Sequence, residues 1–261
     1  MKIPIAFECH GDTIRGAFHP AEEALSAPIV LLLRGFPPYE DSPFADRLTK
    51  RDIHVVTIDF RGALQSDGVF TLSNVQEDIQ AAIAFLQQDG VLAPYGFDAD
   101  QLILGGTSFG GGMALAYAVR HPEIKRIFSL AGNDFGDFAR QYKRDPDFAS
   151  MTDAVFEELW TSSDTVRLGN RTVKELLDDP RPYDLRLNAP ALADRDILLI
   201  GGWDDHEVTI EDRILPFYRA LKEAGAQTVQ IAAVQDDHSF EKCGQEVVAL
   251  IVRWLKLSEP S

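Results

Sequence analysis

The segment from residue 102 to residue 118 constrains the fold of this chain more than any other. It reads LILGGTSFGGGMALAYA, in which an apolar run passes through a glycine-rich turn into a helical pattern. A short apolar strand followed at once by a helix is typical of the strand–helix units of an α/β protein. The turn carries Ser108 between Gly106 and Gly110, in the arrangement G-x-S-x-G.

The glycines of this turn indicate that Ser108 is a nucleophile. On a sharp strand-to-helix turn, side chains two residues before and after the serine would collide with neighbouring backbone, and glycine removes them. The hydroxyl then projects above the sheet beside a helix N-terminus, where developing negative charge is stabilised. A glycine-rich turn without chemistry and a phosphate-binding loop are the competing interpretations. The second lacks the G-K-[ST] sequence that it requires.

The rest of the chain alternates short β-rich runs with helical patterns, which predicts an α/β fold with a mostly parallel central sheet flanked by helices. Residues 3–8 and 13–18 flank a turn at 10–12 and predict an N-terminal hairpin. Further strands are expected at residues 29–33, 54–58, 101–104, 126–130, 196–200 and 228–234. Apolar residues at helical spacing predict helices at about 74–88, at 210–221 before Gly225, and near the C-terminus.

One segment, residues 133–195, interrupts this alternation. It contains helical patterns at 153–160 and 173–178 and no obvious strand. An insertion this long is usually functional rather than a bare loop. We interpret it as a small helical lid on a core domain made of residues 1–132 and 196–261. The alternative interpretation is that these helices only pack on the edge of the sheet and do not form a lid.

The histidine that activates the serine can be found by elimination. A serine on such a turn takes its base from further along the chain, with the acid in between. Of the six histidines, those at positions 10, 19 and 54 precede the serine. His121 ends the helix after the turn, and His206 lies among the candidate acids. His238 remains, just after the last expected strand, at the carboxyl edge where active sites of α/β sheets gather.

The orienting acid is expected after the strand at 196–200. The sequence there contains Asp204 and Asp205 side by side. Asp205 has the better local spacing, with glycine three residues before it and valine three residues after it. Asp204 stays the alternative, because one of the two aspartates can instead cap the helix that begins near Thr209.

Two backbone N–H groups are needed to stabilise the oxyanion of an acyl-transfer reaction. The residue after the serine, Phe109, supplies one. We expect the second from Phe36, in the loop that follows the strand at 29–33, because Pro37 and Pro38 have no N–H to donate. A rigid proline turn without a catalytic task is the alternative for this loop.

Together these residues resemble the α/β-hydrolase superfamily, within its carboxylesterase, dienelactone hydrolase and prolyl-oligopeptidase-like branches. The resemblance covers nearly the whole chain. Besides the serine turn it includes Asp59-Phe60-Arg61-Gly62, which is similar to the family's D-x-R-G turn. The G-x-x-D-x-x-V spacing around Asp205 and the D-H-S-F sequence around His238 are similar to the family's acid and histidine loops.

The loop before Phe36 departs from the family, which usually carries His-Gly where this chain has Arg34-Gly35. The oxyanion donor is a backbone N–H and survives the change. The guanidinium of Arg34 either binds a carboxylate of the substrate or forms a structural ion pair. With Trp160 in the expected lid and Trp203 beside the acid, Arg34 completes the predicted substrate-binding residues. The aromatic rings favour an apolar or aromatic acyl group.

The resemblance implies a serine hydrolase that cleaves carboxylic esters through an acyl-serine intermediate. The catalytic triad would be Ser108, Asp205 and His238. No cofactor and no metal are implied. A peptidase or amidase that uses the same residues is the first alternative. An inactive hydrolase fold that serves as a binding module is the second.

The composition limits the partners. A formal net charge of −16 disfavours nucleic acids and anionic membrane surfaces, so the expected partner is a small-molecule ester or amide.

The N-terminus has no signal-peptide pattern, and no apolar run is long enough to span a membrane. Cys9 and Cys243 lie at opposite ends of the chain and match no metal motif. We therefore expect a cytoplasmic protein. The sequence leaves the choice between a monomer and a homodimer open.

Overall fold

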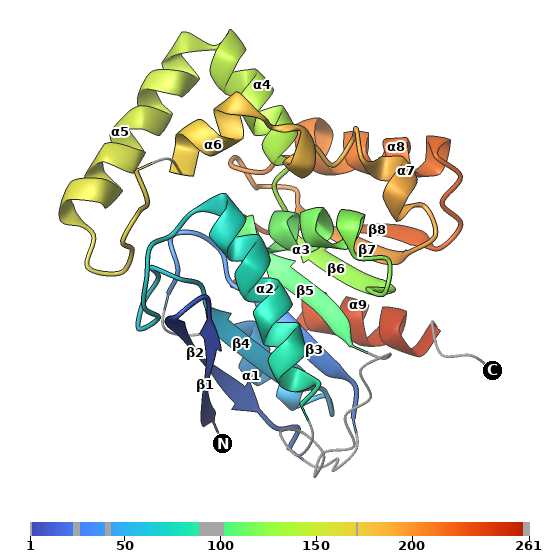
Figure 1. Ribbon diagram of the computed structural model, residues 1–261. Helices are drawn as coiled ribbons and strands as arrows, with labels where there is room; N and C mark the ends of the chain where they lie inside the picture. The colour runs from blue at the N-terminus through green and yellow to red at the C-terminus, as the bar shows by residue number, and fades with distance from the viewer. Residues whose placement is uncertain (1, 23–26, 40–42, 89–101, 171, 258–261) are drawn as a thin grey trace.

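The computed structural model describes residues 2–22, 27–39, 43–88, 102–170 and 172–257 (Figure 1). Within these ranges, an eight-stranded sheet has the strand order β1-β2-β4-β3-β5-β6-β7-β8. The strands are β1 (Ile3–Cys9), β2 (Asp12–His19), β3 (Ile29–Leu33), β4 (His54–Asp59), β5 (Ile103–Thr107), β6 (Arg126–Leu130), β7 (Asp196–Gly202) and β8 (Val229–Val234). The predicted α/β fold class is confirmed.

The pairing of the strands determines where the site can form. Every neighbouring pair from β4 to β8 is parallel, whereas β1 and β2 form an antiparallel hairpin whose second strand pairs antiparallel with β4. The hairpin turns at His10 and Gly11, with φ of 51° and 88°, as a tight hairpin turn requires. The carboxyl ends of parallel strands lie at the same edge of a sheet. The residues that follow β5, β7 and β8 therefore emerge at one edge.

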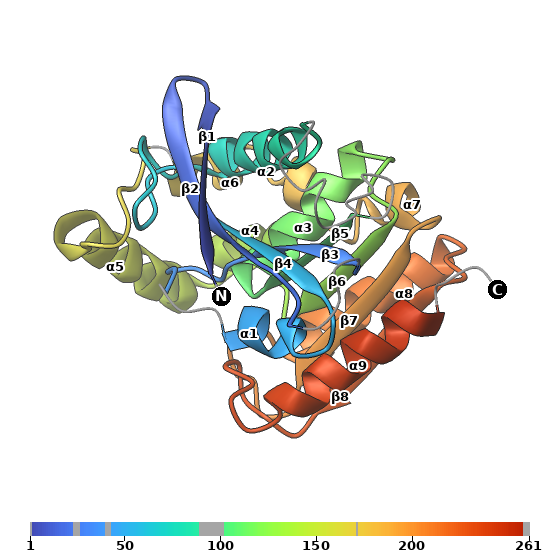
Figure 2. The same cartoon turned by 90° about the horizontal axis from the view of Figure 1, so that it is seen from below.

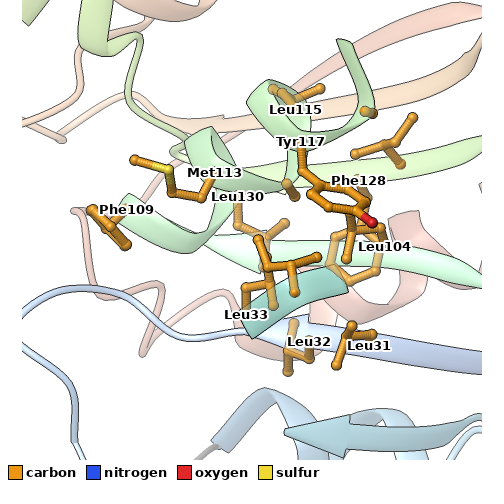
Figure 3. Packing of buried hydrophobic residues seen from close by; sticks show 14 of the residues in the cluster. Leu31, Leu32, Leu33, Leu104, Phe109, Met113, Leu115, Tyr117, Phe128 and Leu130 are labelled. Carbon is orange, nitrogen blue, oxygen red and sulfur yellow. The ribbon is translucent and has the colours of Figure 1, made fainter. Parts of the chain in front are cut away.

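Helices cover both faces of this sheet. Helices α2 (Leu72–Leu86) and α3 (Phe109–Arg120) lie on one face, and α1 (Pro43–Thr49) and α9 (Gly244–Leu257) lie on the other (Figure 2). All residues of β3 are buried, as expected for a strand covered on both sides. Figure 3 shows leucines of β3 and β5 and Phe128 of β6 packed together with side chains of α3.

Strand β5 begins and ends later than the strand expected at 101–104, of which residue 101 lies outside the described ranges. It continues through Gly105 and Gly106 to Thr107. Glycine usually weakens a strand, but here the missing side chain is needed. An ideal Cβ on Gly105 would lie 2.1 Å from the ring of Phe128. The strand therefore extends to the residue before Ser108.

Two predicted helices also have shifted boundaries. Helix α2 begins at Leu72, because the Thr71 hydroxyl accepts a hydrogen bond from the N–H of Asn74 and caps the helix. The helix expected at 210–221 begins as a π-helical turn, Ile210–Ile214, and continues as α8 (Leu215–Glu223).

None of the helices within the described ranges is both long and apolar enough to cross a lipid bilayer.

The segment at 133–195 is helical, as its sequence indicates. Its helices are α4 (Phe135–Arg144), α5 (Pro146–Ser162), α6 (Thr172–Asp178), the short 3₁₀ helix η3 (Arg181–Tyr183) and α7 (Ala189–Leu192). Helix α4 was not predicted, and α5 is longer than the pattern at 153–160. Asp134 and Asp145 cap α4 and α5 by accepting backbone hydrogen bonds. Helices α4, α5 and α6 stand together at one end of the molecule (Figure 1).

The buried core predicts how two leucines respond to truncation. Leu104, on β5, is 0% exposed, whereas Leu187 is 59% exposed. Leu104→Ala should lower the free energy of unfolding by about 2–5 kcal/mol, because it leaves a cavity between the sheet and its helices. Leu187→Ala should change it by less than about 0.5 kcal/mol. Urea denaturation of both variants tests this, and equal losses would contradict the described core.

Candidate active site

Ser108 occupies a strained turn between β5 and α3. Its φ of 51° and ψ of −117° lie in a region that residues other than glycine rarely adopt. Backbone hydrogen bonds hold it there. Its N–H donates to the carbonyl of Leu130 at 2.8 Å, and its carbonyl accepts from the N–H groups of Gly112 and Asn133 at 3.1 and 3.3 Å. Strain of this kind persists only where the surrounding structure enforces it, and it gathers at functional sites.

The flanking glycines are required by close packing, as the sequence pattern predicts. An ideal Cβ on Gly106 would lie 2.4 Å from the carbonyl carbon of Gly110. An ideal Cβ on Gly110 would lie 2.3 Å from the carbonyl oxygen of Leu33. Real Cβ atoms do not approach backbone so closely, so the turn brings the start of α3 against the end of β3 only with glycine at both positions.

This packing brings the predicted oxyanion loop to the serine. An ideal Cβ on Gly35 would lie 3.6 Å from the Cβ of Ser108, so the loop after β3 contacts the serine turn directly. The rings of Phe36 and Phe109 lie 5.7 Å apart. Among the described residues, neither the Phe36 nor the Phe109 N–H donates to another protein group. The two N–H groups that the sequence assigns to the oxyanion hole thus have no protein partner in the described part of the chain.

A phenylalanine cluster joins this loop to the inserted helices. Its members are Phe36, Phe60, Phe70, Phe109, Phe135 and Phe156, whose neighbouring rings lie 4.7–6.3 Å apart. The ring of Phe156, from α5, stacks on Phe36 with an interplanar angle of 18°. Helix α5 therefore contacts the predicted oxyanion loop through these two rings.

Asp205, rather than Asp204, contacts the histidine. The Nδ1 of His238 lies 2.7 Å from Oδ2 of Asp205. The other oxygen, Oδ1, accepts from the N–H groups of Glu207 and Val208 at 2.8 and 2.9 Å. Asp204 instead accepts a hydrogen bond from the side chain of Gln235 at 2.8 Å and is exposed. The structure therefore pairs the preferred acid with His238.

A buried aspartate, which sequence reasoning missed, positions the histidine loop. Asp236 is 0% exposed, and its carboxylate accepts from the N–H groups of Asp237 and Cys243 at 2.9 and 2.7 Å. Its carbonyl accepts from the N–H of Asp204 at 3.0 Å. These bonds join both sides of the loop around His238 to the acid loop. In the sequence, Asp236 and Asp237 stand side by side before His238, and this pattern does not reveal which of them is buried.

The acid and base shift each other's pKa in opposite directions. Burial acts to lower the pKa of His238, but the hydrogen bond and charge of Asp205, together with Glu207 and Asp237, outweigh it and raise the pKa. Burial acts to raise the pKa of Asp205, but hydrogen bonds from His238 and from the N–H groups of Val208 and Glu207 lower it overall. Asp205 is thus ionised and favours the tautomer of His238 with the proton on Nδ1.

The serine and the histidine emerge on the same side of the sheet without a direct bond. Ser108 follows β5 and His238 follows β8, and both are partly exposed. No hydrogen bond joins the Ser108 hydroxyl to His238 within the described part of the chain. Such bonds are often long without substrate and shorten in the reacting complex. The structure thus brings together two of the three predicted triad residues directly.

The predicted substrate-binding residues differ in their surroundings. The Nε of Arg34 lies 3.0 Å from Oδ1 of Asp59, and its Nη1 donates to the carbonyl of Tyr39 at 2.8 Å. Arg34 is 9% exposed, so its contacts favour the structural ion pair over a substrate contact. Trp160, on α5, and Trp203, after β7, are each 55% exposed, and their rings are accessible to a ligand.

The other two histidines that follow Ser108 have different surroundings. The Nδ1 of His121 donates a hydrogen bond to the carboxylate of Glu123 at 2.9 Å, and the His121 ring stacks on Tyr117. His206 is exposed beside the acid. A search of the described residues finds no cluster of three or more histidine, cysteine, aspartate or glutamate side chains that could hold a metal ion.

The profile of the alpha/beta hydrolase family matches residues 30–250, which include the serine turn, the acid and the histidine. The chain belongs to the alpha/beta hydrolase family. No curated protein matches this hydrolase. The match and the parallel sheet together confirm the resemblance seen in the sequence.

Solved structures share the fold of this hydrolase at low sequence identity. DcsB, in complex with its substrate analogue, is 15% identical, with a TM-score of 0.74 over 100% of both chains. Est1E from Butyrivibrio proteoclasticus is 14% identical, with a TM-score of 0.71 over 97% of this chain and 98% of its own; another Est1E structure contains ferulic acid. Pyrococcus horikoshii acylaminoacyl peptidase is 18% identical, with a TM-score of 0.69 over 98% of this chain and 41% of its own. At these identities the likeness shows the fold alone.

The pairing with Asp205 predicts how His238 titrates. In the unsubstituted protein, the pKa of His238 should lie above its ordinary value. Asp205→Asn removes the charge that stabilises the imidazolium, so the pKa of His238 should fall. Asp204→Asn is the matched control and should leave it nearly unchanged. NMR titration of the His238 ring measures all three, and a fall with Asp204→Asn alone would reverse the assignment of the acid.

Proposed function

We propose that this protein is a serine hydrolase that cleaves carboxylic esters through an acyl-serine intermediate, with Ser108, Asp205 and His238 as its catalytic triad. The observation that carries the proposal is the strained turn of Ser108 at the same sheet edge as the bonded pair of Asp205 and His238. A strained serine, an oriented imidazole and two unused N–H groups are the parts that acyl transfer requires.

Each part has a chemical task in this proposal. The Nε2 of His238 takes the proton of Ser108 as the serine oxygen attacks the ester carbonyl carbon. The N–H groups of Phe36 and Phe109 donate to the oxyanion that forms, and Asp205 stabilises the imidazolium. His238 then donates its proton to the leaving alcohol, and the C–O bond to that alcohol breaks. Water, activated by the same imidazole, hydrolyses the acyl-serine.

The phenylalanine cluster favours an apolar or aromatic acyl group. Phe36 and Phe156 are only partly buried, so their rings offer apolar surface next to the predicted oxyanion loop. The ferulic acid found with Est1E, a protein of the same fold, is an aromatic acid and supports this choice. In the proposal α5 acts as a lid that carries one wall of the acyl pocket.

A peptidase or amidase is the second candidate, supported by the shared fold of the acylaminoacyl peptidase. This chain covers 41% of that protein's length, whereas it covers 98% of Est1E. Ester cleavage is therefore the first proposal. Faster cleavage of an aminoacyl p-nitroanilide than of the matching p-nitrophenyl ester would reverse the order.

We also propose a cytoplasmic location. The cysteines Cys9 and Cys243 are free thiols, as such a location would allow.

Removing the nucleophile should abolish ester cleavage. Ser108→Ala should lower kcat for a p-nitrophenyl benzoate by at least about 10³-fold, because no acyl-serine can form. Ser150→Ala changes an exposed serine of α5 and should retain activity. A fluorophosphonate probe should label the unsubstituted protein and Ser150→Ala but not Ser108→Ala. Equal hydrolysis by both variants would overturn Ser108 as the nucleophile, and no labelling of the folded protein would indicate a binding module instead.

The raised pKa of His238 predicts the pH dependence of the reaction. The imidazole must be neutral to accept the serine proton, so kcat/KM should rise with pH as His238 loses its proton. Since that pKa is raised from 6.5, the midpoint of the rise should lie above 6.5. A pH profile of kcat/KM measures this, and a midpoint clearly below 6.5 would contradict the assignment of the base.

A further inference from the structure

Glu207 places a second carboxylate beside the imidazole of His238. Its Oε2 lies 3.9 Å from Nε2 of His238, the nitrogen that Asp205 does not use. The Glu207 side chain is 75% exposed, whereas that of Asp205 is 0% exposed. Glu207 therefore lies next to Nε2 on the solvent-exposed side of the ring, which we call the open side.

The backbone keeps Glu207 in this place. Its N–H donates to Oδ1 of Asp205 at 2.8 Å, and the next residue, Val208, donates to the same oxygen at 2.9 Å. The carboxylate that orients His238 thus also anchors the residue that carries the second charge. Only the side chain of Glu207 is free to adjust.

Within the described part of the chain, His238 is the one basic side chain within ion-pair distance of the carboxylate of Glu207. Among the described residues, no lysine or arginine forms an ion pair with it. Asp205 and Asp237 are the other acids that act on His238, and Lys242 acts on Asp237. Arg34, in the loop beside Ser108, is already paired with Asp59. The open side of the imidazole is therefore negative, in a chain whose formal net charge is −16.

The proposed reaction places the leaving group at this side. The Nε2 of His238 donates its proton to the oxygen of the departing alcohol, so that oxygen must come within hydrogen-bond distance of Nε2. Substituents on the alcohol then lie within a few ångströms of Glu207. Opposite charges at this separation attract each other near a protein surface, and salt weakens the attraction.

We propose that Glu207 selects esters whose leaving alcohol carries a positive charge, such as an amino alcohol or a quaternary ammonium alcohol. The inference rests on the proposed ester hydrolysis and names its substrate class. In the step concerned, the bond from the carbonyl carbon to Ser108 stays, the bond to the alcohol oxygen breaks, and the His238 proton goes to that oxygen. The alcohol leaves as a cation and the acyl-serine remains.

Two esters of the same acid isolate the charge. Benzoylcholine and 3,3-dimethylbutyl benzoate share the acyl group and nearly the same shape, but only the first has a cationic leaving group. We expect kcat/KM for the cationic ester to be at least about tenfold higher at low salt, and the ratio to fall as salt is added.

Glu207→Gln should bring the ratio of the two kcat/KM values close to one. Glu211→Gln, which removes an exposed acid of the π-helical turn, is the matched control and should keep the ratio of the unsubstituted protein. Thermal unfolding of each variant checks that it is folded. A high ratio that persists in Glu207→Gln would overturn the role of Glu207.

The two proposals fail in different ways. If the neutral ester is cleaved in a Ser108-dependent reaction and the ratio is close to one in the unsubstituted protein, the charge selection is wrong and the ester hydrolase stands. If neither ester is cleaved and the fluorophosphonate probe does not label Ser108, the proposed function itself is wrong.

Discussion

The close approach of β3, β5 and the start of α3 is the constraint on which the site depends. Gly106 and Gly110 allow backbone to touch backbone there, and the bond from the Ser108 N–H to Leu130 ties the turn to β6. A positive φ at Ser108 costs conformational energy, which the surrounding sheet offsets. The strained serine is therefore a product of the whole sheet, and the same contacts bring the Gly35 loop against it.

The carboxylate of Asp205 organises the second half of the site. One oxygen contacts His238, and the other accepts the N–H groups of Glu207 and Val208. Since the side chain is fully buried, these bonds compensate for the loss of water around its charge. One residue thereby sets the orientation of the imidazole, the shape of the acid loop and the position of Glu207. Base orientation and the proposed charge selection share one structural origin.

The phenylalanine cluster connects these parts to the inserted helices. Phe109 begins α3, Phe36 belongs to the loop after β3 and Phe156 to α5. Aromatic rings in contact bury much apolar surface and restrict one another's motion. A movement of α5 would thus change the surroundings of Phe36, which is how an inserted helix can act on a site built from the sheet.

Sequence alone determined the α/β class, the strand–turn–helix around Ser108 and the order of the candidate residues, because these follow from local periodicity and from glycine. It also favoured Asp205 as the acid but kept Asp204 as the alternative. Only the tertiary structure decided that Asp205 meets His238, that Arg34 pairs with Asp59 and that β5 continues through its glycines beside Phe128. It also revealed Asp236 and Glu207, whose neighbours come from other segments of the chain. Such contacts depend on distances between distant residues, which local sequence patterns do not encode.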